Sequence, residues 1–147
     1  MITPIYNSKE NNWHWAPDMV RDGYIFNGWY RDAACTQKLP DEFAVDEITT
    51  FYAKWAPMYS YTVNKDSTAT ITGLRYYNPG QTEFVIPATI DQYKIKSIGA
   101  NAFNSNTLIE KIILPNDIEE IKENAFYCCT NLKSINIPKA VVKIDNY

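Results

Sequence analysis

The second half of the chain repeats one pattern of apolar and polar positions every 23 residues. When Ile98 is aligned with Ile121, identical residues or conservative apolar swaps follow at the same spacing. The identical pairs are Ile98/Ile121, Asn101/Asn124, Ala102/Ala125, Phe103/Phe126, Thr107/Thr130, Ile112/Ile135, Pro115/Pro138 and Ile121/Ile144. A repeat of this length indicates structural units that stack and bury their apolar faces against one another.

Within each unit, alternating apolar residues predict a short strand. Ile112 and Leu114 in one unit, and Ile135 and Ile137 in the next, point to the same side because side chains alternate along a strand. The proline that follows cannot donate a ladder hydrogen bond, so it ends the strand. The Ala-Phe pair of each unit is expected to place a small residue and a large ring in the turn on the far side.

A degenerate unit precedes these two. Phe84–Pro87 matches Ile112–Pro115, but the offset is five residues longer than the regular repeat. The insertion falls near Asp91–Lys94, a polar run that predicts a protruding loop. Further upstream, Tyr61–Val63 and Ala69–Thr72 alternate on either side of a polar turn and predict a β-hairpin. We expect this hairpin to cover the N-terminal end of the stack.

These units resemble the BspA-type leucine-rich repeats, whose pattern is I-G-x-x-A-F-x-x-C-x-x-L-x-x-I-x-L/I-P. The matching residues are Ile98-Gly99, Ala102-Phe103 and Ile109–Pro115 in one unit, and Ala125-Phe126, Cys129, Leu132 and Ile135–Pro138 in the next. Lys122 stands where the pattern has Gly, and Asn106 where it has Cys. The resemblance implies a curved solenoid over about residues 58–147, on a secreted or surface-attached bacterial protein that serves adhesion or protein binding.

The first half is rich in aromatic residues and has a different pattern. Gly23–Asp32 and Thr50–Trp55 are rich in β-forming residues and predict strands. Gly28 inside the first string indicates a bulge or a close approach by another backbone. Residues 35–47 predict a polar loop whose apolar anchors are Leu39, Phe43 and Val45.

The two aromatic strings resemble the Listeria–Bacteroides repeat, with its signatures G-Y-x-F-x-G-W-Y-x-D and T-x-x-Y-A-K-W. The likeness is strong from about Pro17 to Trp55 and weak upstream. It implies a small β-grasp-like module that acts as a spacer or interaction unit in surface proteins. We therefore predict a mainly β (α+β) fold with two domains, a β module at 1–57 and a leucine-rich repeat solenoid at 58–147.

Composition narrows the partners. The 147 residues carry a formal net charge of -3, with acidic and basic residues mixed along the chain and no long basic run. This balance argues against nucleic acid or an anionic membrane as the partner. No stretch approaches the roughly 20 apolar residues that a membrane-spanning helix needs.

The last repeat unit stops before its Ala-Phe pair, so Val141 and Ile144 lack a stacking partner. We therefore expect further repeats or self-association through this end.

The chain shows no pattern of catalytic chemistry. It has a single histidine, His14, and no metal-protease, nucleophile-elbow, phosphate-loop or calcium-loop motif. We predict no catalytic residue, no cofactor and no metal site. The acidic residues Asp41, Glu42, Asp46 and Glu47 could bind calcium, but their irregular spacing favours a solvated loop.

Three cysteines do not form a disulfide framework. Cys128 and Cys129 are adjacent and could bridge only through a strained ring, while Cys35 is far away in sequence. We expect one thiol of the adjacent pair to pack inward and the other to be exposed.

Two surfaces are candidate binding sites. The tryptophans could stack on sugar rings, and we expect Trp29 and Trp55 in the core, which leaves Trp13 and Trp15 as a candidate aromatic platform. The outward strand positions of the solenoid form the second surface and comprise Glu83, Val85, Lys111, Ile113, Ser134 and Asn136.

These features together predict a non-enzymatic, adhesin-like module on the bacterial cell surface or outside the cell, which binds a protein of a host or neighbouring cell through the solenoid face. Two alternatives stay open: a structural spacer within a larger surface protein, and a carbohydrate-binding accessory module.

Overall fold

The computed structural model describes residues 19–40 and 50–145. The chain divides into two compact units, Met1–Ala56 and Pro57–Tyr147. In the described residues the secondary structure consists of β-strands and no helix, so the fold is mainly β, as predicted. It follows that no helix in the described part has the length and apolar character needed to cross a bilayer.

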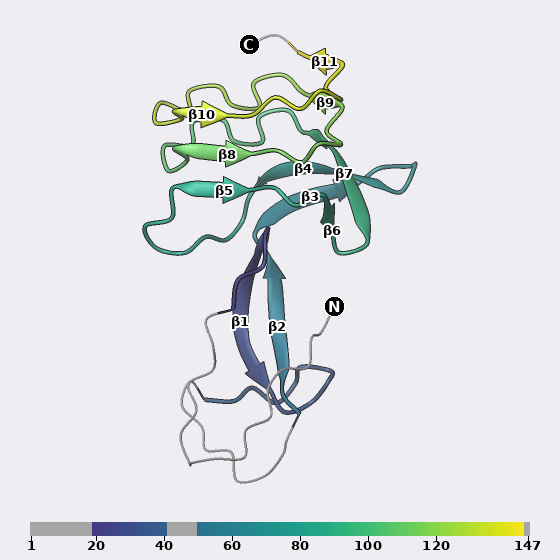
Figure 1. The fold of residues 1–147 in the computed structure, drawn as a ribbon, viewed down its shortest axis with the longest axis vertical. Coiled ribbons are helices and arrows are strands. Elements are labelled where there is room, and N and C mark those ends of the chain that lie inside the picture. The colour runs from purple at the N-terminus through teal and green to yellow at the C-terminus, as the bar shows by residue number, and fades with distance from the viewer. Residues whose placement is uncertain (1–18, 41–49, 146–147) are drawn as a thin grey trace. The chain divides into compact units, whose positions relative to one another are not determined.

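The N-terminal unit contains a two-stranded sheet of β1 (Tyr24–Tyr30) and β2 (Tyr52–Pro57). The two arrows run in opposite directions in Figure 1. Both strands lie within or close to the strings that predicted them. The buried core comprises Trp29, Leu39, Phe51 and Ala53, and Met19, Phe26 and Trp55 pack against it. The expected core positions of Trp29 and Trp55 and the anchor role of Leu39 are confirmed, while Phe43 and Val45 lie outside the described residues.

Gly28 occupies a crowded position with positive φ. Its φ is +99°, and a Cβ atom there would lie 2.6 Å from Cε of Lys38. Of the two predicted causes, the approach by another backbone is wrong, because the neighbouring group is a lysine side chain. Lys38 reaches this position because its own residue forms an isolated antiparallel bridge with Tyr30.

The C-terminal unit is built on two ladders of strands. The front ladder consists of three parallel strands, β5 (Glu83–Val85), β8 (Lys111–Ile113) and β10 (Ser134–Ile135). The back ladder consists of four parallel strands, β4 (Thr68–Leu74), β7 (Tyr93–Ile98), β9 (Glu120–Ile121) and β11 (Lys143–Ile144). The chain alternates between the ladders, which run side by side in Figure 1. We call each 23-residue unit a coil.

The register of both ladders follows the sequence repeat. On the front ladder Ile112 lies opposite Ile135, and on the back ladder Ile98 lies opposite Ile121. Ile98 and Ile112 are fully buried and Ile121 is nearly so. Residues 23 positions apart therefore stack in one apolar column, which confirms the predicted stack of repeats.

The Ala-Phe turns stack as well. The rings of Phe103 and Phe126 lie parallel with centroids 5.3 Å apart, and the backbone N–H of Phe103 donates to the carbonyl oxygen of Ala125 at 2.8 Å. Positive φ angles recur at equivalent places in the two turns, at Asn101 and Asn124 and again at Ser105 and Cys128. Hydrogen bonds between these turns thus connect the coils on a third side of the stack, besides the front and back ladders.

The expected N-terminal hairpin is present. β3 (Tyr59–Val63) pairs antiparallel with β4, whose other edge pairs parallel with β7, so the hairpin covers the first back-ladder strand of the repeats. The fit is tight at Gly99, where a Cβ atom would lie 2.8 Å from the carbonyl oxygen of Ile71. The close approach of the cap explains the need for glycine at this coil.

The insertion near Asp91–Lys94 is not the protruding loop that its polarity predicted. β6 (Thr89–Ile90) pairs antiparallel with β7, so that Thr89 lies opposite Lys94 and Ile90 opposite Tyr93. Backbone pairing with β6 extends β7 to Tyr93 and leaves only a tight turn. Polar side chains such as Thr89 and Lys94 fit this pair of strands because they are exposed to solvent.

Burial falls off sharply in the last coil. Leu114 and Ile121 are 2% and 1% exposed, whereas their equivalents Ile137 and Ile144 are 52% and 46% exposed, and Val142 is 86% exposed. The apolar pattern is the same in both coils. The difference arises because the next coil covers the first two residues.

Candidate binding surfaces of the repeat stack

The front ladder brings all six predicted outward residues together. Glu83, Lys111 and Ser134 lie opposite one another across the three strands, and Val85 lies opposite Ile113. Asn136 follows directly after β10. We call this surface the front face. Sequence reasoning found its members because strand alternation separates outward from inward positions.

Ion pairs between neighbouring coils balance the charge of this side. The Nζ atom of Lys111 lies 3.0 Å from Oε2 of Glu83, and Nζ of Lys133 lies 2.9 Å from Oε2 of Glu110. All four groups are solvent-exposed to a large degree, so each pair contributes on the order of 0–1 kcal/mol to stability. Their main effect is to leave the front face without a strong electric field.

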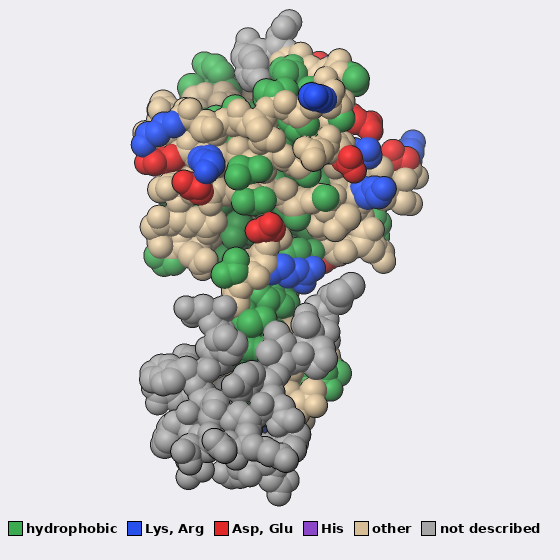
Figure 2. All heavy atoms as spheres, in the orientation of Figure 1, with side chains coloured by type: hydrophobic (Ala, Val, Ile, Leu, Met, Phe, Trp, Pro, Cys, Tyr) green, Lys and Arg blue, Asp and Glu red, His purple; other side chains and the backbone are tan. Residues whose placement is uncertain are grey.

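Ile113 is the exposed apolar residue at the centre of the front face. Its residue surface is 39% exposed, although it is the middle member of its column between half-buried Val85 and exposed Asn136. Figure 2 shows the hydrophobic side chains of the repeat stack as separate patches among charged groups of both signs. Such an arrangement suits an isolated apolar anchor with a polar surround.

Asn136 serves the stack itself. The backbone N–H of Leu114 donates to Oδ1 of Asn136 at 2.7 Å, and Nδ2 of Asn136 donates to the carbonyl oxygen of Leu114 at 2.9 Å. The side-chain amide thereby continues the front ladder one step beyond β10. Both functional groups of the amide are occupied, a role that the sequence pattern did not indicate.

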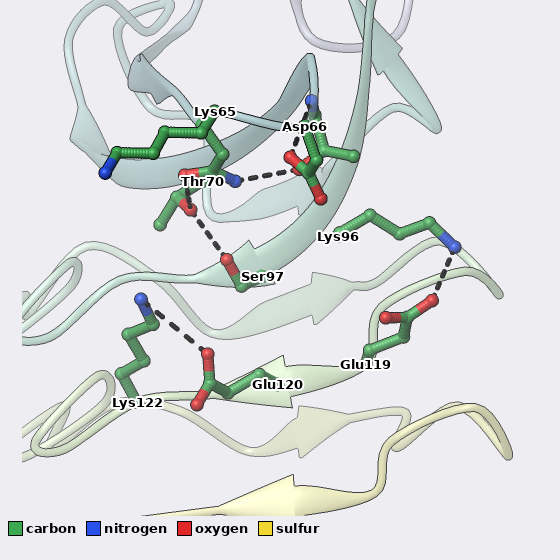
Figure 3. Close-up of a pocket in the computed structure, with 10 residues that line it drawn as sticks. Lys65, Asp66, Thr70, Lys96, Ser97, Glu119, Glu120 and Lys122 are labelled. Carbon is green, nitrogen blue, oxygen red and sulfur yellow. Dashed lines mark hydrogen bonds and ion pairs between the residues drawn. The ribbon is translucent and has the colours of Figure 1, made fainter.

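A polar hollow lies on the back ladder and was not anticipated from the sequence. It has a volume of about 350 Å³ and is open to solvent on one side (Figure 3). We call it the back hollow. Its lining residues come from the β3–β4 turn, from β4 and β7, and from the coil of β9, and they comprise Asn64, Lys65, Asp66, Thr68, Thr70, Lys96, Ser97, Glu119, Glu120 and Lys122.

The back hollow forms because the outward side chains that lie opposite one another on successive strands differ in size. Thr70 lies opposite Ser97, and Ser97 lies opposite Glu120 on the next strand. Small side chains in the first two coils and a long one in the third leave a step in the surface. Thr70 and Ser97 form its floor and are each only 5% exposed.

Charged groups surround this floor in compensating pairs. Nζ of Lys96 lies 2.7 Å from Oε1 of Glu119, and this hydrogen bond raises the pKa of Lys96. Nζ of Lys122 lies 3.6 Å from Oε2 of Glu120. The hydroxyl of Thr68 donates to Asp66 and, together with the Thr68 backbone N–H, lowers the pKa of that carboxyl.

A family model identifies the family of this repeat stack. The model of the BspA type leucine rich repeat region matches residues 69–147. The chain belongs to the BspA-type leucine-rich repeat family. The Listeria-Bacteroides repeat domain matches residues 6–54, so both sequence resemblances are confirmed. No curated protein matches the chain.

Two solved structures are similar in fold to part of this BspA-type chain. A leucine rich repeat protein from T. pallidum shares 24% identity with a TM-score of 0.54, over 59% of this chain and 40% of that one. A leucine rich cell surface protein from Faecalibacterium prausnitzii shares 32% identity with a TM-score of 0.53, over 60% of this chain and 25% of that one. The BspA-type chain therefore spans less than half the length of each.

The cysteines of this BspA-type chain are free thiols. Cys128 is exposed, whereas Cys129 is partly buried and its Sγ lies 3.0 Å from the carbonyl oxygen of Phe103, to which it donates. Burial raises the pKa of Cys129. The expected division into one inward and one exposed thiol is confirmed.

Trp13, Trp15 and His14 lie outside the described residues, as does the acidic group Asp41, Glu42, Asp46 and Glu47. Within the part of the chain that the structure describes, His, Cys, Asp and Glu side chains form no cluster that could hold a metal ion.

Proposed function

We propose that this chain is a non-enzymatic interaction module of a bacterial cell-surface or secreted protein, and that its front face binds a protein partner. The observation that carries the proposal is the exposure of Ile113 at the centre of a ladder with balanced charge. The cell-surface description of the Faecalibacterium prausnitzii protein and the two families matched by the chain support the location.

The front face can bind without large rearrangement. Its central strand β8 pairs with β5 on one edge and with β10 on the other, and the inward residues Phe84 and Ile112 are fully buried. A rigid surface loses little entropy on association. Ile113 would act as an anchor, because covering an exposed isoleucine stabilises a complex by about 1 kcal/mol or more.

An array of purified extracellular host glycoproteins, probed with the labelled chain, tests this function. For any bound protein, I113D should weaken binding at least about tenfold, because a carboxylate replaces an apolar anchor in a desolvated contact. T72D is the matched control, since Thr72 is exposed on the back ladder. Equal weakening by both variants, or a bound protein that ignores I113D, would refute the use of the front face and favour the spacer role.

A second copy of the chain is a further proposed partner, through the last coil. Ile137, Val142 and Ile144 are 52%, 86% and 46% exposed there, although their pattern is that of a buried coil. Stacking a like coil on this end would cover them. We expect light scattering to show concentration-dependent dimers that I144D abolishes, and a wild-type monomer at all concentrations would contradict the proposal.

A further inference from the structure

The hydrogen bonds of the back hollow have a fixed direction. The ionised carboxylate of Asp66 can only accept, so the Thr68 hydroxyl must donate to it at 2.7 Å. Thr68 then accepts from Nδ2 of Asn64 at 2.8 Å, which turns Oδ1 of Asn64 toward Thr70. Thr70 donates to this oxygen at 3.1 Å. The direction of each hydrogen bond in this series is therefore set by the charged carboxylate of Asp66, which lies at one end of the series.

This direction determines what Ser97 can offer to a ligand. The hydroxyls of Thr70 and Ser97 lie 2.7 Å apart, and the single proton of Thr70 is already given to Asn64. The proton between the two hydroxyls is consequently that of Ser97. The Ser97 oxygen keeps lone pairs but has no proton left to donate. The floor of the hollow therefore favours a ligand group that donates a hydrogen bond.

The walls carry three lysines and three carboxylates. Lys96 and Glu119 pair with each other, which leaves Lys65, Lys122, Asp66 and Glu120. Figure 3 shows the ammonium groups of Lys65 and Lys122 on the same side of the Thr70–Ser97 pair, with the Asp66 carboxylate on the other side. Both hydrogen bonds from Thr68 reach Oδ1 of Asp66. Oδ2 is thus open to a second donor. Lys65 has no ion-pair partner among the described residues.

Lys122 can change partners at little cost. Its distance of 3.6 Å from Glu120 is long for a charge-assisted bond, whereas Lys143 lies 2.9 Å from the other oxygen of Glu120. If Lys122 turns toward a ligand, Glu120 is still paired with Lys143. A ligand carboxylate can therefore recruit Lys122 without leaving an uncompensated charge.

We propose that the back hollow binds an acidic saccharide, with the sugar carboxylate between Lys65 and Lys122 and sugar hydroxyls donating to Ser97 and to Oδ2 of Asp66. The volume of about 350 Å³ lies at the small end of ligand sites and suits one sugar ring with its substituents. A neutral sugar leaves the lysines unused, a small inorganic anion leaves the two acceptors unused, and a free amino acid has one donor group for two separated acceptors.

A titration monitored by the backbone amide signals in NMR tests this site, using a hyaluronan-derived tetrasaccharide whose uronic acid rings supply the carboxylate. We expect shifts at Thr70, Ser97 and Lys122 that saturate in the millimolar range. Lactose, sodium acetate and glycine at the same concentrations should leave these signals in place. Shifts of equal size with acetate or glycine, or none with the tetrasaccharide, would overturn the proposal.

Variants separate this site from general charge effects. K122Q should weaken tetrasaccharide binding about fivefold, as expected for one exposed charge pair, and S97A should weaken it further. K133Q is the matched control, because Lys133 is likewise an exposed lysine that pairs with a glutamate but lies beside the front ladder. Equal effects of K122Q and K133Q would refute the site. I113D should leave the titration unchanged, so this result is independent of binding at the front face.

Discussion

The isoleucine column of the back ladder allows one substitution to be tested at three matched positions. Ile98, Ile121 and Ile144 lie opposite one another on β7, β9 and β11. Their exposed fractions are 0%, 1% and 46%. Backbone register and side-chain type are the same at each position, so the three alanine variants differ chiefly in how completely the neighbouring coils cover the side chain.

The expected losses follow from burial. Replacing isoleucine by alanine removes about three carbons, or roughly 2.4 kcal/mol of transfer free energy when they are fully buried. A cavity left between two coils raises the cost, so I98A and I121A should each lower the free energy of unfolding by about 3–4 kcal/mol. I144A leaves no closed cavity and loses about half the transfer term, or roughly 1 kcal/mol.

Urea unfolding followed by far-ultraviolet circular dichroism measures these losses, because the repeat stack contributes most of the strands. Tryptophan fluorescence gives an internal control, since all four tryptophans lie in the first 57 residues. The fluorescence transition of the N-terminal unit should not move in any variant. Equal losses at the three positions, or a loss below about 1 kcal/mol for I98A, would refute the argument that coil stacking supplies the stability.

Two further predictions concern single side chains. T68V should raise the pKa of Asp66 toward its ordinary value of 3.8, because one of the two hydrogen bonds to the carboxylate is lost. The stability that these bonds contribute is present above the ordinary pKa and is lost as the pH falls through the lowered value, so the difference between wild type and T68V in urea should shrink under acid. A carboxyl titration by NMR with the wild-type Asp66 at or above 3.8 would contradict this. C128G should raise the free energy of unfolding by about 0.5–1 kcal/mol, because φ is +54° at Cys128 and glycine adopts this conformation without a Cβ clash. C129A is expected to have the opposite sign through loss of the contact with Phe103, and an unchanged urea midpoint for C128G would count against the strain argument.

The repeat stack could be read from the sequence because its pattern is local and periodic. Spacing alone placed Ile112 opposite Ile135, and alternation alone assigned Ile113 to the surface. The insertion before Ile95 was misjudged because polar composition does not report backbone pairing. Thr89 and Lys94 pair with each other at the edge of the stack, and no feature of either residue type indicates it.

The back hollow and the role of Asn136 show what sequence reasoning could not reach. The hollow joins residues of the β3–β4 turn to Glu119 and Lys122 on a later coil, which no repeat spacing relates to one another. Asn136 occupies an outward position by alternation, yet its amide bonds to Leu114 across the coil boundary. Such contacts depend on distances between coils and on side-chain orientation.

The sequence by itself determined the family, the 23-residue repeat and the inward and outward positions of its strands, because these depend on the order of apolar and polar residues along a regular backbone. Only the tertiary structure decided which outward residues gather into a hollow, which amide is occupied by the stack, and how exposed each equivalent isoleucine is. Those properties depend on what covers a residue in space. Two coils with the same pattern therefore differ when one has a neighbour on both sides and the other has a neighbour on one side.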